Sequence, residues 1–144
     1  MSPDHRKLRV FHEADALAIA IYQRTRGFPR EEWFGLRSQM RRAAVSVPCN
    51  IVEGNARNSA RDYVRFLYVA IGSCSELQYL IALAHDLGFG KQENWTPIAE
   101  QCGSVARQLH TLIDRMEAIA GGRDEKNRHP DPGSSRQHRP TTDN

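Results

Sequence analysis

The chain has 144 residues, of which 40% are hydrophobic and 26% are charged, so its composition is that of a single globular domain. No run approaches the roughly 18 apolar residues that a membrane span needs, and residues 1–9 lack the apolar stretch of an export signal, so we expect a cytoplasmic protein with no membrane partner. The formal net charge of +3 is too small to imply nucleic-acid binding by bulk attraction, and only the distribution of charge can argue for that function.

Apolar residues recur every three or four positions over long windows, which is typical of helices. The windows predict four helices, at residues 10–26, 33–57 and 60–86 and from 92 or 96 to 120. Ser59 followed by Asp62 resembles a capping box at the start of the third helix, and Gly121-Gly122 marks the expected end of the fourth. Short loops make successive helices antiparallel neighbours, so the predicted fold is an all-α, antiparallel up-down-up-down four-helix bundle.

The bundle domain is expected to span residues 10–120, preceded by a flexible N-terminus at 1–9. Residues 121–144 contain no Leu, Ile, Val, Phe, Tyr or Trp. Such a segment cannot bury enough apolar surface to offset the entropy of ordering it, so we predict a disordered polar tail.

The second and third predicted helices carry more apolar residues than one buried stripe needs. Val45, Pro48 and Val52 form a displaced stripe on the second helix. Outside the main seam of the third helix lie Phe66, Val69, Leu80, Leu83 and Leu87. Because burying a Leu- or Phe-sized side chain is worth roughly 1.5–3 kcal/mol, this surplus predicts a homo-oligomer. The alternative is that a single bundle buries broad faces.

No site for metal or covalent chemistry emerges from the sequence. No Glu is followed three residues later by His, the six histidines have no ligand spacing, and glycine-rich phosphate loops are missing. Cys49, Cys74 and Cys102 are widely spaced, and the last two fall at seam positions where small buried hydrophobes explain them better than nucleophiles. We therefore predict no catalytic residue, no metal, no cofactor and no enzymatic activity.

Arginine supplies 17 of the 20 cations, and six arginines between residues 37 and 65 face only Glu53 and Asp62. An arginine stripe with an aromatic residue such as Tyr68 nearby is typical of a surface that follows a phosphate backbone and stacks a base. We predict that RNA or DNA contacts Arg37, Arg41, Arg57, Arg61 and Arg65. The alternatives are pairing between subunits, plain solubility, and a GC-rich genome that encodes Arg in place of Lys.

A polar ribbon follows the second predicted helix beside its apolar stripes. Within the ribbon, Arg42 and Glu53 are three turns apart and cannot pair directly. We assign Arg42, Asn50 and Glu53 to the bundle or to a subunit interface, where ion pairs set the register. The alternative is that the ribbon faces water and is only the solvent-exposed side of the helix.

Residues 41–54, RRAAVSVPCNIVEG, resemble the four-helix bundle family first noticed as open reading frames in intervening sequences of bacterial 23S rRNA genes. Arg-Arg-Ala, Ser-x-Pro, Asn-Ile and Glu-Gly fall in the family's order and spacing. Flanking matches such as Gly35-Leu36 and Leu87-Gly88 extend the resemblance over about residues 8–120. Cys49 and Val52 depart from it, since small Ala-like residues are usual there.

The resemblance implies a homopentameric ring of bundles. It also implies kinship with the accessory protein of diversity-generating retroelements, a basic pentameric barrel that binds a reverse transcriptase and nucleic acid. Together with the arginines, it predicts a non-enzymatic oligomer that binds nucleic acid. The alternative is a protein–protein scaffold or accessory ring for a partner such as a reverse transcriptase, without direct nucleic-acid contact.

Overall fold

A computed structural model describes residues 4–128, most of which lie in four long helices. The helices are α1 (Arg9–Arg24), α2 (Leu36–Asn55), α3 (Ala60–Asp86) and α4 (Gln92–Asn127). Short 3-10 helices, η1 (His5–Lys7) and η2 (Arg30–Glu32), precede α1 and α2. No strand occurs between residues 4 and 128, so the all-α prediction is confirmed for this part of the chain.

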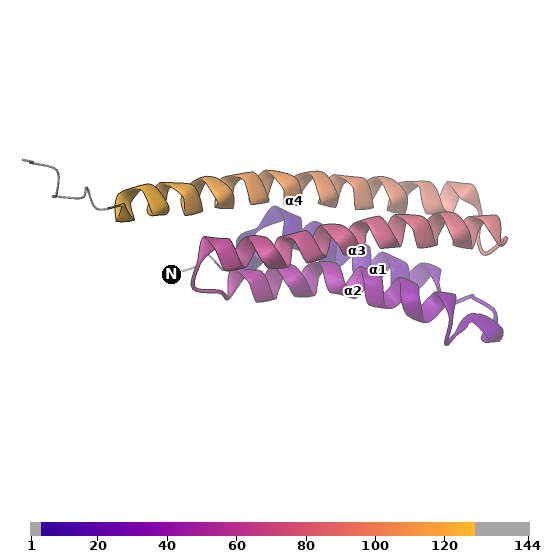
Figure 1. Cartoon of the computed structure of the whole chain (residues 1–144). Helices are drawn as coiled ribbons and strands as arrows, with labels where there is room; N and C mark the ends of the chain where they lie inside the picture. Colours follow the sequence, from indigo (N-terminus) through magenta and orange to yellow (C-terminus); the bar gives the residue numbers. More distant parts are fainter. Residues whose placement is uncertain (1–3, 129–144) are drawn as a thin grey trace, which may run out of the picture.

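Successive helices run in opposite directions, and each packs against two neighbours (Figure 1). The most extensive contacts join α2 to α3 and α3 to α4, while α1 closes the bundle against α2 and α4. The α1–α2 connection and the α3–α4 turn lie at one end of the bundle. The N-terminal segment and the α2–α3 turn lie at the other end, where α4 extends past the other helices.

The apolar positions predicted to face the core are buried. The seam of α3 is buried throughout, at Tyr63, Leu67, Ala70, Cys74, Leu77, Ile81 and Ala84. The matching stripe of α1 is also buried, at Val10, Ala14, Leu17, Ile21 and Thr25. The α2 stripe continues without interruption past Pro48, which lies inside the helix. One hydrophobic core therefore runs along the inside of all four helices.

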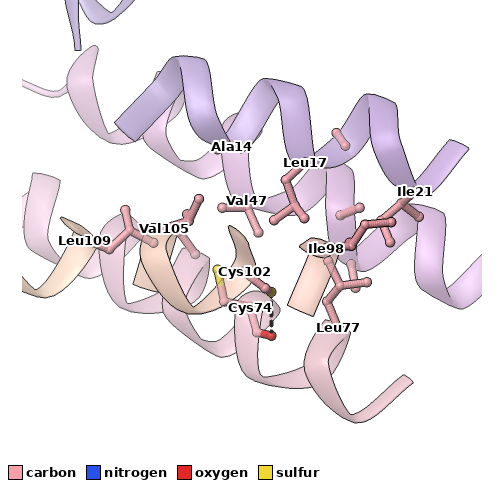
Figure 2. Close-up of a cluster of buried hydrophobic side chains, with 14 of the residues drawn as sticks. Ala14, Leu17, Ile21, Val47, Cys74, Leu77, Ile98, Cys102, Val105 and Leu109 are labelled. Carbon is pink, nitrogen blue, oxygen red and sulfur yellow. Dashed lines mark hydrogen bonds between the residues drawn. The ribbon is translucent and has the colours of Figure 1, made fainter. Parts of the chain in front are cut away.

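Cys74 and Cys102 face each other in this core, one from α3 and one from α4 (Figure 2). The Cys102 thiol donates a hydrogen bond to the Cys74 carbonyl oxygen at 3.4 Å. A hydrogen bond with the Cys74 side chain and burial both raise the pKa of the Cys102 thiol. Cys102 therefore stays protonated at neutral pH, and the pair behaves as small hydrophobic residues.

The ends of α3 follow from side-chain capping and from glycine geometry. At its start, the Ser59 hydroxyl accepts a hydrogen bond from the Asp62 backbone N–H at 3.1 Å, which confirms the predicted cap. After its end, Gly88 and Gly90 have φ of 82° and 97°, which only glycine adopts readily. Trp95 packs on Gly90 and donates its indole N–H to the Phe89 carbonyl oxygen at 2.7 Å.

Helix α4 does not end at Gly121-Gly122 as the sequence predicts, but continues to Asn127. Neither glycine has a positive φ, and glycine inside a helix costs only about 1 kcal/mol relative to alanine, so nothing forces the helix to stop. The added segment also pairs with α3, where Arg61 lies 2.6 Å from Asp124. Residues 129–144, the rest of the predicted polar tail, lie outside the described residues.

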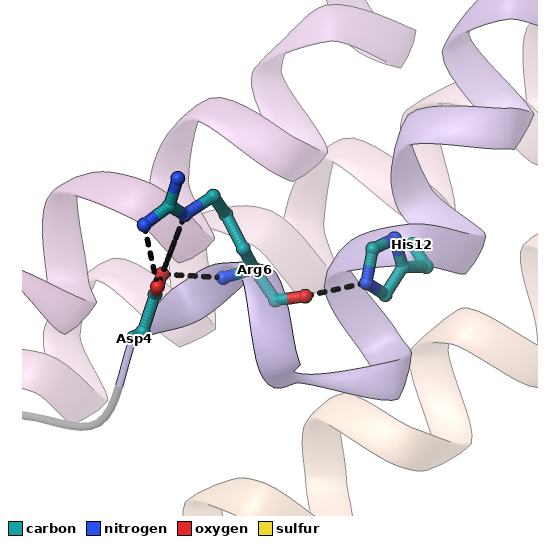
Figure 3. A network of polar contacts seen from close by, with 3 residues as sticks. All are labelled: Asp4, Arg6 and His12. Carbon is teal, nitrogen blue, oxygen red and sulfur yellow. Dashed lines mark hydrogen bonds and ion pairs between the residues drawn. The ribbon is translucent and has the colours of Figure 1, made fainter.

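The described part of the N-terminal segment contains η1, and the expected flexibility of residues 1–9 stays a prediction. The Asp4 carboxylate accepts a hydrogen bond from the Arg6 backbone N–H at 3.0 Å and pairs with the Arg6 guanidinium at 2.7 Å (Figure 3). Hydrogen bonds from Arg6 lower the pKa of Asp4 to about 2. The His12 ring bonds to the Arg6 carbonyl oxygen, which ties η1 to the first turns of α1.

The surplus apolar residues divide between core and surface. Leu80 is buried within the single chain, so it needs no partner subunit, and Val45 and Val52 are half-buried. Val69 and Leu87 remain exposed to 53% and 52%. By length and composition α3 is apolar enough to cross a membrane, but in this structure it lies between α2 and α4.

Candidate nucleic-acid interface

The arginines predicted to contact nucleic acid lie in two places at opposite ends of the bundle. One group lies where α2 begins and the other lies around the α2–α3 turn (Figure 1). At 1.5 Å per residue, about 21 Å of α2 separates Arg41 from Asn55, two residues before Arg57. The first group and its neighbours form the corner cluster, which consists of Tyr22, Trp33, Phe34, Arg37, Arg41 and Arg42. The second forms the turn cluster, which consists of Arg57, Arg61, Arg65 and Phe66.

Aromatic rings hold two guanidinium groups of the corner cluster, those of Arg37 and Arg41. The Arg37 guanidinium lies 4.5 Å from the centroid of the Trp33 ring, and that of Arg41 lies 4.5 Å from the centroid of the Tyr22 ring. Arg41 also donates hydrogen bonds to the Thr25 hydroxyl at 2.9 Å and to the Tyr22 carbonyl oxygen at 3.3 Å. Cation–π stacking and these bonds order the side chains before any ligand arrives.

The corner cluster lines an open hollow of about 580 Å³ between α1, α2 and the loop that joins them. Between residues 4 and 128, no carboxylate forms an ion pair with Arg37, Arg41 or Arg42. Burial and the nearby positive charges of Arg37 and Arg26 lower the pKa of Arg41. The hollow therefore concentrates positive charge that the described part of the chain does not neutralise.

The turn cluster differs because carboxylates pair with two of its arginines. Arg61 lies 2.6 Å from Asp124 of α4, and Arg65 lies 3.9 Å from Asp62. Arg57 stacks with its guanidinium 4.5 Å from the centroid of the Phe66 ring. A hollow of about 490 Å³ adjoins these residues, lined by Asn50, Arg57, Asp62, Arg65, Phe66 and Val69. Its positive charge is thus partly cancelled within the chain.

Within the described part of one chain, the residues assigned to an interface do not form an ion-pair ladder. The Asn50 amide donates to the Ser46 carbonyl and hydroxyl oxygens at 2.8 and 3.0 Å, and Ser73 of α3 donates to the same hydroxyl at 2.8 Å. Arg42 and Glu53 are exposed, and neither has an ion-pair partner in the described chain. Their place between subunits stays a prediction.

Sequence reasoning missed the aromatic half of the corner cluster. Trp33 precedes Arg37 by four positions, which would have indicated contact on the helix predicted for residues 33–57. In the structure α2 begins only at Leu36, and Trp33 reaches Arg37 from the turn before it. Tyr22 meets Arg41 only because α1 packs against α2, which no local pattern reveals. The partner of Arg61, Asp124, was likewise hidden because it lies in the segment predicted to be disordered.

A half-buried carboxylate, Glu13, is the other polar site inside the bundle. It accepts hydrogen bonds from Ser104 and Gln108 of α4 and from Arg9 of α1. Burial alone would raise the pKa of Glu13, but these hydrogen bonds outweigh it and leave the pKa below its usual value. Glu13 therefore joins α1 to α4. Between residues 4 and 128, no group of three or more His, Cys, Asp or Glu side chains is placed to hold a metal ion.

Comparison with known proteins agrees with this architecture. A crystal structure of a protein with unknown function from the S23 ribosomal protein family of Bacteroides thetaiotaomicron superposes with a TM-score of 0.66 and 20% identity. The match covers 72% of this chain and 97% of that one, and it shows a shared fold. No curated protein sequence matches the chain. The family model for the 23S rRNA-intervening sequence protein matches residues 6–111, from η1 into α4, and the chain belongs to that family.

Proposed function

We propose that the protein is a non-enzymatic homo-oligomer, a pentameric ring, that binds the phosphate backbone of RNA or DNA. The contacts are assigned to Arg37, Arg41, Arg57, Arg61 and Arg65. The observation that carries the proposal is the corner cluster, where the Arg37 and Arg41 guanidinium groups stack on aromatic rings and have no carboxylate partner between residues 4 and 128. Ordered guanidinium groups bind phosphate through paired N–H donors and lose little side-chain entropy in doing so.

Exposed apolar side chains on α3 support the oligomer. Tyr68 and Val69 are exposed to 52% and 53%. On α2, Val45 and Val52 are half-buried and keep some apolar surface open. Burying such residues against another copy stabilises an assembly by roughly 25 cal/mol per Å² of apolar surface. Arg42, Asn50 and Glu53 are assigned to the contact between subunits, and repetition of the arginine clusters around the ring strengthens binding to a long nucleic acid.

The two clusters contribute unequally under this proposal. Between residues 4 and 128, no carboxylate competes with phosphate for Arg37 and Arg41, whereas Asp124 and Asp62 compete for Arg61 and Arg65. Exposed ion pairs are worth only about 0–1 kcal/mol, so nucleic acid displaces them at moderate cost. We expect the corner cluster to provide more affinity per arginine than the turn cluster.

The test compares two charge-removing variants with a control variant outside both clusters. Arg37→Gln/Arg41→Gln removes two corner charges, and Arg57→Gln/Arg61→Gln/Arg65→Gln removes three turn charges. Arg115→Gln removes one charge from an exposed position on α4, outside both clusters. Glutamine is chosen over glutamate because an acid beside the buried Thr25 hydroxyl would disturb folding for unrelated reasons.

Fluorescence anisotropy with labelled RNA and DNA measures affinity, and light scattering measures the size of the assembly. Both cluster variants should bind less tightly while the oligomer and the Arg115→Gln control stay unchanged. Unchanged affinity for RNA and DNA in both cluster variants would refute the proposed function. A protein partner that remains bound after nuclease treatment, and equally in all variants, would favour the scaffold alternative.

A further inference from the structure

Phe34 is the most exposed large apolar side chain of the corner cluster, with 95% of its surface open to solvent. The other four phenylalanines of the chain are buried or half-buried. Its neighbours anchor the loop, because Leu36 is buried and the Trp33 indole N–H donates to the Phe28 carbonyl oxygen at 3.1 Å. Within residues 4–128, folding therefore gives the Phe34 ring no partner.

The surroundings of Phe34 are strongly cationic. Residues 22–46 contain six arginines and only two acids, Glu31 and Glu32. The Glu32 carboxylate accepts a hydrogen bond from the Leu36 backbone N–H at 3.2 Å, so it caps α2. A ligand that suits this region has an anionic group for the arginines and a flat apolar face for Phe34. A nucleotide combines the two.

Within the cluster, Phe34 offers the open aromatic face. Guanidinium groups already cover the other rings, with Arg37 and Arg30 at 4.5 and 5.4 Å from the Trp33 centroid and Arg41 at 4.5 Å from that of Tyr22. A base stacks on Phe34 through its flat face. In a duplex, the neighbouring base pairs cover that face. Such stacking is tolerant of sequence, because every base has a π-face.

We infer that the corner cluster binds an unpaired nucleotide, with its base stacked on Phe34 and its phosphate held by Arg37 and Arg41, so that the protein prefers single-stranded nucleic acid to a duplex. The inference rests on the proposed function and adds the class of ligand. The hollow of about 580 Å³ lies within the range of roughly 300–1,000 Å³ usual for small-molecule sites.

The experiment uses short oligonucleotides that present the same number of phosphates in different forms. The probes are single-stranded RNA, single-stranded DNA, a DNA duplex, and a single-stranded DNA whose sugars carry no bases. Each is titrated into the wild-type protein, Phe34→Ala and a control, Tyr79→Ala. Tyr79 is also exposed, to 66%, but lies on α3 and lines no part of the hollow.

Wild-type protein should bind the single strands at least tenfold more tightly than the duplex or the abasic strand. Phe34→Ala should lose about tenfold in affinity for the single strands, in line with the stacking of one base, and should bind the abasic strand as wild type does. Tyr79→Ala should behave as wild type. The RNA and DNA arms show whether the 2′-hydroxyl contributes.

Equal affinity for all four probes, or an unchanged Phe34→Ala variant, would overturn the inference and leave the proposed function standing. Absence of binding to every probe would refute both the inference and the proposed function. The other possible ligand of Phe34 is a second copy of the chain, and light scattering of Phe34→Ala tests this possibility. An altered assembly size would show that Phe34 lies at a subunit contact, which also overturns the inference.

Discussion

Replacing Gly54 by alanine tests how closely α2 and α3 approach beside their turn. A Cβ atom at Gly54 would lie 2.7 Å from Cδ2 of Tyr63 and 2.9 Å from Cβ of Phe66. Both distances are shorter than the roughly 3.5 Å at which carbon atoms make favourable contact. The Phe66 Cβ is fixed to the backbone of α3, so it cannot swing aside, and the helices must move apart.

Two effects of opposite sign set the size of the change. Alanine is better than glycine inside a helix by about 1 kcal/mol, while overpacking a tight contact costs about 1–3 kcal/mol. We expect the free energy of unfolding of Gly54→Ala to fall by about 1 kcal/mol. For a domain of this size, that corresponds to a fall of about 4 °C in Tm.

Gly72→Ala is the matched control, because nothing lies within 4 Å of the position its Cβ would take. Without a clash, only the helix preference of alanine acts, and the free energy of unfolding should rise by about 0.5–1 kcal/mol. Urea unfolding followed by circular dichroism measures both variants. If Gly54→Ala stabilised the protein as much as Gly72→Ala, the close packing of α2 on α3 would be refuted.

Two further predictions concern Tyr63 and Asp124. The Tyr63 hydroxyl is buried without a hydrogen-bond partner in the described chain, so Tyr63→Phe should leave stability unchanged or raise it by up to about 1 kcal/mol. Burial raises the pKa of Tyr63 to about 12, so the folded state keeps the proton that the unfolded chain releases near pH 10. Wild type should therefore lose stability between about pH 10 and 12, and urea titrations should show that Tyr63→Phe escapes this loss; parallel losses would contradict the assignment. Asp124→Asn should free Arg61 from its partner and raise the affinity for RNA about two- to fivefold at low salt, whereas an unchanged affinity in anisotropy titrations would exclude Arg61 from the interface.

The helices and their core faces could be predicted because one periodicity marks both. Residues spaced by three and four lie on one side of a helix, and those of α3 from Tyr63 to Ala84 are all buried. Helix ends were harder to predict, because a glycine can either end a helix or lie inside one. Gly88 and Gly90 adopt a positive φ and end α3, whereas Gly121 and Gly122 remain helical. Composition alone does not distinguish the two cases.

The candidate site was harder to predict from the sequence, because contacts between different helices determine which arginines are neutralised and which stack on aromatic rings. The spacing of Arg57, Arg61 and Arg65 predicts a cationic stripe, but Asp124 reaches Arg61 from a helix 63 positions further along the chain. Conversely, Arg37 and Arg41 gain importance from the aromatic rings beneath them, and the Tyr22 ring comes from a different helix. Charge counts along a sequence do not show which charges are cancelled in space.

The salt dependence of binding tests most directly the claim that corner arginines neutralise phosphates. The affinity of a short single-stranded RNA is measured over a range of monovalent salt for wild type and for Arg37→Gln/Arg41→Gln. Log affinity should fall linearly with log salt, and the slope of the variant should be shallower by about 1.4, since each phosphate neutralised on a single strand contributes about 0.7. Parallel lines with equal slopes would contradict the account.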